Sequence, residues 1–335
     1  MAVNFKFDYY HLKIDKKRSR ITDQGAQFFG NISLDAFCKE LSTYWKNNSD
    51  DFKGTGKHII DFKDGKKWIK WVSVEYDIKN KVYKFLFTFN DVEVDPRVLE
   101  DLSDNVVTQE IPDQHGQRTL LHIVIKPASG MNDANISIQN ITGLKKDFLL
   151  RLFRNLTLLA YSNDEYWLEK DPMTQADIRC KPEIELNAVT SDEIIEAINN
   201  GLLKNIYFVE RTQSLDKFDT ANYLDEEKLA LTIKPSKNVR FFKNAKKEDI
   251  FEWVKKVRSN KLDKFKETPQ TYLIIQDPQT KTEVKHEFLE TSIMGFTKKS
   301  VLRWEDREPK THNLLKSESP MSIPQFFSTM IDSLN

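Results

Sequence analysis

The chain has 335 residues, enough for two domains that each bury a core of their own. Aromatic residues make up 11% of the chain, including 22 Phe, which excludes an intrinsically disordered protein. The 51 Lys and Arg residues balance the 51 Asp and Glu residues, so a uniformly basic or acidic protein is excluded. Any charged surface must therefore come from local clustering.

Alternation and turn signals predict a β-rich first half. Residues 4–14 form a predicted opening strand, followed by a charged turn over residues 15–20. Apolar residues at helical spacing predict one helix over residues 34–45 and another over residues 145–161. The predicted strands between these helices cover residues 58–62, 68–77, 82–89, 119–126 and 135–141.

A polar stretch with two prolines, residues 162–182, is the predicted domain boundary. The second half has predicted helices over residues 192–199, 247–258 and 322–334, and predicted strands over residues 205–211, 229–234, 271–276 and 283–289. The predicted fold class is α+β. It comprises a β-rich domain with a closing helix (residues 1–165) and a mixed α/β domain with a basic face (residues 183–335).

The last predicted helix carries an apolar stripe and begins with a capping-box pair, Ser322 and Gln325. Such a stripe packs on its own domain or forms the contact of a homodimer, and the sequence leaves both open.

Two cysteines, Cys38 and Cys180, are too few for a disulfide framework and favour a reducing compartment. Charges interrupt the N-terminal sequence, so no signal peptide is expected. No stretch approaches the roughly 18 uncharged residues of a membrane span. We expect a cytoplasmic protein that does not insert into a membrane.

The most informative feature is a basic block over residues 234–266, which has twelve Lys or Arg and four Asp or Glu. The preceding residues 151–233 have the opposite balance, with nine Lys or Arg and sixteen Asp or Glu. Phosphate contacts need only flexible cationic ends at loose spacing, and no base-reading motif accompanies the block. We therefore expect sequence-independent DNA binding through Lys234, Lys237, Arg240, Lys243, Lys246, Lys247, Lys255, Lys256 and Arg258.

Three alternatives remain open. A charged helix is often simply solvated, and Ile250 and Val254 show that this helix packs one face inward. A metal-dependent nuclease would use Asp277, Glu283 and Lys285, in which the carboxylates hold Mg²⁺ and the lysine polarises water. A protein-interaction module would instead bind a basic partner through the acidic residues 225–227.

Other catalytic patterns are missing from the sequence. The six histidines show no HxH or HxxxH spacing, and neither cysteine has a nearby partner. No phosphate-binding glycine loop and no GxSxG elbow occurs. No cofactor or metal is expected, and a non-enzymatic protein is favoured.

The order of elements in the second half carries a resemblance. SDEIIEAINNGLLKNIYFVER is followed by a strand ending in Ile233-Lys234-Pro235, then the lysine-rich helix and the hairpin LIIQDPQTKTEVKHEFLE. This order resembles the lambdoid phage-exclusion proteins of the RexA type and, more distantly, the KwaB subunits of Kiwa defence systems. The first half is similar in outline, from an early Phe-x-x-Tyr segment (residues 7–10) onward.

The resemblance implies a DNA-binding, homodimeric protein that protects bacteria from phage. It also implies a partner, often a membrane protein encoded nearby. Lys234, Lys237 and residues 243–247 fall where that family is lysine-rich. This chain is longer than the family, with extra residues in the β-meander and around residues 214–227.

Overall fold

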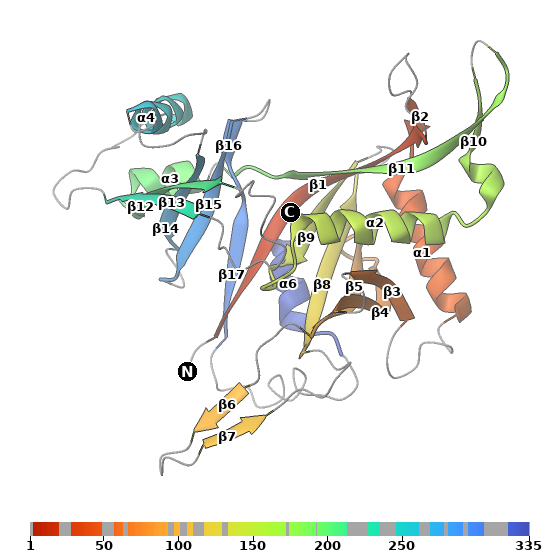
Figure 1. Cartoon of the computed structure of the whole chain (residues 1–335), viewed down its shortest axis with the longest axis horizontal. Coiled ribbons are helices and arrows are strands. Elements are labelled where there is room, and N and C mark those ends of the chain that lie inside the picture. The colour runs from red at the N-terminus through yellow and green to blue at the C-terminus, as the bar shows by residue number, and fades with distance from the viewer. Residues whose placement is uncertain are drawn as a thin grey trace, which may run out of the picture. The chain divides into compact units, whose positions relative to one another are not determined.

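In the computed structural model the chain divides into two compact units, each described by itself (Figure 1). Unit 1 comprises Met1–Asn187 and Trp304–Asn335, and unit 2 comprises Ala188–Arg303. Both contain helices and antiparallel sheet, which confirms the α+β class. The structure describes residues 3–19, 28–48, 57–62, 66–92, 97–100, 106–109, 117–128, 133–171, 174–191, 193–212, 227–234, 246–260, 269–277, 281–290, 294–304 and 321–334.

A large sheet forms the body of unit 1, in the strand order β10-β11-β1-β9-β8-β5-β4-β3, with β2 paired to β1. A separate two-stranded ribbon pairs β6 with β7. The strands are β1 (Val3–Arg18), β2 (Phe28–Asn31), β3 (Lys57–Phe62), β4 (Lys67–Asp77), β5 (Val82–Asp91), β6 (Arg97–Glu100), β7 (Val106–Gln109), β8 (Gln117–Pro127), β9 (Asp133–Gln139), β10 (Leu168–Lys170) and β11 (Asp177–Ala188).

Two helices cover one face of this sheet. Helix α1 (Leu34–Asn48) and helix α2 (Lys146–Ala160) were both predicted from their apolar spacing. They bury Phe37 and Phe153 in one cluster with the strand residues Ile14, Phe85 and Ile123. The central strands are therefore the most buried part of the unit.

The C-terminal helix α6 (Pro324–Asp332) covers the opposite face of the same sheet. The ring of Phe326 lies 4.5 Å from that of Phe5 and 5.6 Å from that of Phe7. In β8, His122 contacts α6 whereas its neighbours face the α1–α2 core, as strand alternation requires. Coverage on both faces explains why β8 contains a continuous run of buried residues.

The two units differ from the predicted domains at two places: where the first domain ends and where the second domain ends. Residues 162–182, where the domain boundary was predicted, contain the 3-10 helix η2 (Asp164–Trp167), β10 and the start of β11. The last helix, expected in the second domain, belongs to unit 1 because its aromatic side chains pack against β1 and β8.

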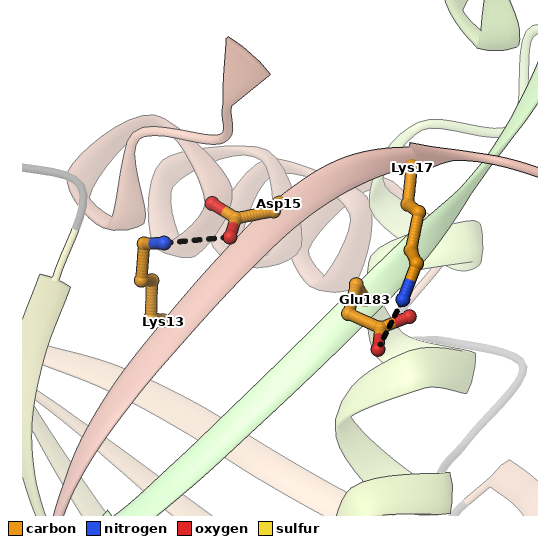
Figure 2. Close-up of polar contacts among 4 residues, drawn as sticks. All are labelled: Lys13, Asp15, Lys17 and Glu183. Atoms are coloured by element: carbon orange, nitrogen blue, oxygen red, sulfur yellow. Dashed lines mark hydrogen bonds and ion pairs between the residues drawn. The ribbon is translucent and has the colours of Figure 1, made fainter. Parts of the chain in front are cut away.

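The predicted charged turn after residue 14 is wrong, because β1 continues as a strand to Arg18. Its charged side chains find partners, as Figure 2 shows for two pairs. Lys13 Nζ donates to Asp15 Oδ2 at 2.7 Å, and Lys17 Nζ donates to Glu183 Oε1 of β11 at 3.1 Å. Lys16 Nζ donates to Glu169 of β10 at 2.9 Å. Partners from later strands thus stabilise an extended segment that looks like a turn in isolation.

Unit 2 contains a five-stranded antiparallel sheet in the order β13-β12-β14-β15-β16. Helices α3 (Glu193–Asn199) and α4 (Lys247–Ser259) share one core with it, in which Ile198 and Val254 cluster with the strand residues Phe208, Leu273 and Phe288. Both helices therefore cover the same sheet face. The strands are β12 (Leu203–Thr212), β13 (Glu227–Ile233), β14 (Gln270–Gln276), β15 (Glu283–Glu290) and β16 (Met294–Phe296), followed by β17 (Lys299–Trp304).

Candidate nucleic-acid interface

Six of the nine predicted DNA-contacting residues lie in the described part of unit 2. Lys237, Arg240 and Lys243 lie outside the described residues. Five of the six cations belong to α4 or immediately precede it, and the sixth directly follows β13. They are Lys234, Lys246, Lys247, Lys255, Lys256 and Arg258.

Helix α4 forms where predicted, and its charges suit its ends. The Lys246 N–H donates to the Asp249 carboxylate at 3.1 Å, which satisfies one amide at the helix start. Acidic residues occupy the first turn, and Lys256 and Arg258 occupy the last, as the helix dipole favours. Ile250 and Val254 are fully buried, so the helix has one apolar side fixed against the sheet.

The cations of α4 differ in how freely they meet solvent. Lys246 and Lys256 are exposed. Lys247 Nζ lies 5.7 Å from the centre of the Phe251 ring. Lys255 Nζ forms an ion pair with Glu252 at 3.0 Å. The acids Glu248, Asp249 and Glu252 all precede Lys255, so positive charge gathers at the C-terminal end of the helix.

A further cation, which the sequence did not single out for DNA binding, lies on the opposite face of the unit 2 sheet. Lys285 Nζ lies 3.6 Å from the ring centre of Tyr272 and 5.1 Å from that of Tyr207. The two tyrosines are directly opposite each other on β12 and β14. Because they are 65 positions apart in the chain, no local motif reports the pair.

The alternative nuclease residues lie just after the end of β14 and in the first half of β15. Asp277 lies in the turn between β14 and β15, where its N–H donates to the Thr282 carbonyl at 2.8 Å. Glu283 begins β15, and the Lys285 ammonium lies over the rings of Tyr207 and Tyr272. Across all described ranges, no group of three or more His, Cys, Asp or Glu side chains is placed to hold a metal ion.

The two fully described buried histidines have structural contacts. His122 Nδ1 lies 2.8 Å from Gln139 Oε1, and its Nε2 accepts from the Ile323 N–H at 3.0 Å, which fixes the start of α6. Burial lowers the pKa of His122 to about 4. His286 Nδ1 lies 2.8 Å from the Thr297 carbonyl oxygen. Neither arrangement resembles a catalytic pair.

A buried carboxylate lies in the polar cluster of unit 1 shown in Figure 2. Asp15 is only 2% exposed, and its ion pair with Lys13 leaves Oδ1 without a hydrogen-bond partner among the described residues. The hydrogen bond to Asp15 raises the pKa of the Lys13 ammonium. The nearby Lys17–Glu183 pair joins β1 to β11, so this cluster stabilises the pairing of these two strands.

A hollow of about 340 Å³ in unit 1 lies between α6 and the β4–β5 hairpin. Its lining includes Asp77 and Lys84, whose side chains form an ion pair at 2.7 Å. The hydrogen bonds from Lys84 and Asn80 hold the pKa of Asp77 well below its ordinary value. Lining charges of both signs, including Glu75 and Lys79, give this hollow no clear preference for one class of ligand.

Comparison of the chain with protein-family models, characterised proteins and solved structures finds no match. Within the ranges that the structure describes, no helix is both long and apolar enough to cross a bilayer.

Proposed function

We propose that this protein binds DNA without sequence preference through the basic surface of unit 2. One observation carries the proposal: α4 buries its apolar side and leaves Lys246 and Lys256 exposed. Flexible ammonium groups at a surface suit phosphate oxygens and carry no information about base sequence.

The distribution of charge along α4 supports contact through its C-terminal end. Lys255, Lys256 and Arg258 follow the last acidic residue of the helix, Glu252. The exposed acids at the N-terminal end would repel phosphates, so we expect the backbone of DNA to approach the other end.

A role in antiphage defence rests on the resemblance to the RexA-type and KwaB proteins. In that role DNA would be the signal that the protein senses. A homodimer and a membrane-protein partner encoded nearby are part of the same proposal.

Fluorescence anisotropy with labelled duplex DNA tests the DNA contact. The variant is Lys255→Glu/Lys256→Glu, which reverses two charges at the C-terminal end of α4, outside its buried apolar side. For every phosphate that the variant no longer neutralises, the slope of log K against log salt should fall by about 0.9 on duplex DNA.

Lys181→Glu is the matched control, because Lys181 is an exposed lysine on β11 of unit 1. Equal affinities and salt slopes for wild type, the α4 variant and this control would refute the interface. If wild type binds no nucleic acid, the protein-interaction alternative becomes the better explanation.

A further inference from the structure

We infer that the open face of the unit 2 sheet binds single-stranded DNA, with bases stacked on Tyr207 and Tyr272. This inference deepens the proposed function, on which it rests, by naming the form of DNA and a second contact surface. Both tyrosines alternate with residues of the α3–α4 core, Ile206, Phe208 and Leu273, so their rings point to the other sheet face. Both rings are partly exposed.

The strand register aligns two rows of side chains across this face. Thr232, Tyr207, Tyr272 and Glu287 are successive cross-strand neighbours from β13 to β15 and form the first row. In the adjacent row, Asn205 pairs with Ile274, and Ile274 pairs with Lys285. Lys234 follows the pair Ile206–Ile233 by one position, which places it level with Asn205. An aromatic row therefore lies beside a row with a lysine at each end.

This arrangement fits an extended strand of DNA that runs across the β-strands. Neighbouring strands are about 4.8 Å apart, so Lys234 and Lys285 are separated by about 14 Å, a length that a few nucleotides span. Phosphates following the lysine row would place their bases over the tyrosines. Aromatic rings on an open sheet are a recurring platform for unpaired bases, because every base presents a π face. The exposed Lys204, in the bulge before Asn205, adds a third cation beside the lysine row.

The ammonium of Lys285 lies over both rings, and a base that stacks on them must displace it. Base stacking is the stronger of the two interactions at an exposed site, so a base can displace the ammonium toward a phosphate. Two acids limit the site. Glu287 is the last residue of the aromatic row, next to Tyr272, where the bases would lie. Its carboxylate can accept hydrogen bonds from base amino groups. Glu283 borders Lys285 on β15 and would repel a phosphate beyond it.

On the side of the aromatic row away from the lysine row, Val209 of β12 is buried, so the open area is narrower there. The platform is therefore small and is suited to a few bases of a single strand. A duplex has its bases stacked internally and cannot use the rings in this way. This difference separates the platform from the basic end of α4, which lies on the other side of the same sheet.

The test is anisotropy with labelled oligothymidine and the double variant Tyr207→Thr/Tyr272→Thr. Threonine keeps the preference for strand structure while removing the rings, and circular dichroism checks the fold. Loss of each stacked base should weaken binding about 5- to 140-fold. Tyr207→Phe/Tyr272→Phe keeps the rings and should bind nearly as well as wild type. Removing either lysine, by Lys234→Ala or Lys285→Ala, should reduce the salt slope by about 0.7.

Tyr76→Thr is the matched control, because Tyr76 is an exposed tyrosine of β4 in unit 1. Unchanged oligothymidine binding by a folded double threonine variant would overturn the inference, as would an equal loss in the Tyr76 control. Tighter binding of the matching RNA strand would overturn the assignment to DNA.

The same assays separate this inference from the proposed function. If the α4 charge reversals weaken duplex binding while the tyrosine variants bind oligothymidine normally, only the inference fails. If the tyrosine variants lose single-strand binding and the α4 reversals change nothing, only the α4 interface fails. Wild-type protein that binds neither form removes both.

Discussion

Protonation of His122 should destabilise unit 1 as the pH falls. The imidazole is fully buried between Gln139, the Ile323 amide and the rings of Phe326 and Phe327. Burial is the main reason that its pKa is lowered from 6.5 to about 4, while the hydrogen bond with Gln139 acts in the opposite direction. A protonated Nε2 cannot accept the Ile323 N–H, so protonation also removes the bond that fixes the start of α6.

The sign and size follow from proton linkage. Between pH 6.5 and pH 4 the unfolded chain binds a proton that folded His122 does not, so the free energy of unfolding falls with decreasing pH. The slope is about 1.4 kcal/mol per pH unit, which amounts to about 3 kcal/mol over this interval. Above pH 6.5 both states are neutral at this position, and its contribution is constant.

Urea unfolding at several pH values, followed by tryptophan fluorescence, measures this dependence, and the buried Trp71 contributes a signal from unit 1. His122→Gln removes the titrating group. The stability difference between wild type and this variant should therefore shrink by about 3 kcal/mol between pH 7 and pH 4. Phe327→Leu disturbs the same contact without removing a titrating group and should keep the wild-type pH dependence. A stability difference between wild type and His122→Gln that stays constant with pH would refute the reasoning.

Two further predictions concern packing and charge in unit 1. Phe326→Ala should lower the free energy of unfolding by about 3–5 kcal/mol, because the ring is fully buried against β1. Urea unfolding measures this change. A decrease below about 1 kcal/mol would contradict the packing of α6 on the sheet. Lys67→Met should cost about 1–3 kcal/mol, because the Lys67–Asp91 pair is largely buried and the carboxylate would lose a partner. The same change at the exposed Lys39, which pairs with Asp35, should leave the melting temperature unchanged, and equal effects at both lysines would contradict the burial argument.

Elements with strong local periodicity could be predicted from sequence. Helix α2 lies within one residue of its predicted bounds because Leu149, Leu152, Phe153 and Leu156 repeat at helical spacing. The start of α6 could not be predicted in the same way. Ser322 and Gln325 look like a capping box, but the helix begins after Ile323, with Pro324 in the first turn and no side-chain cap. The Ile323 amide is bound by His122, a partner that lies 201 positions away in the chain.

Long-range pairing also explains the missed domain boundary and the missed end of β1. Residues 15–18 are charged and look like a turn when read alone. They remain extended because Lys16 and Lys17 meet Glu169 and Glu183, carboxylates that follow more than 150 positions later. Glu169 lies within residues 162–182, where the domain boundary was predicted, and Glu183 directly follows them, so both predictions failed because of the same pairing of β1 with later strands. The last helix was assigned to the wrong domain for a similar reason, since Phe326 packs on Phe5 and Phe7 at the other end of the chain.

The two candidate DNA surfaces also differ in whether their residues are close together in the sequence or are brought together only by the fold. The cations of α4 are close together in sequence, so their clustering was visible and the helix that presents them was predicted correctly. The tyrosine platform depends on sheet register, which brings Tyr207 opposite Tyr272 and places Lys285 over both rings. Lys234 belongs to both descriptions: the sequence places it in the basic block, and the register places it at the end of the lysine row. Lys234→Ala should therefore weaken single-strand binding even when α4 is intact, whereas a loss confined to duplex DNA would assign Lys234 to the α4 surface alone.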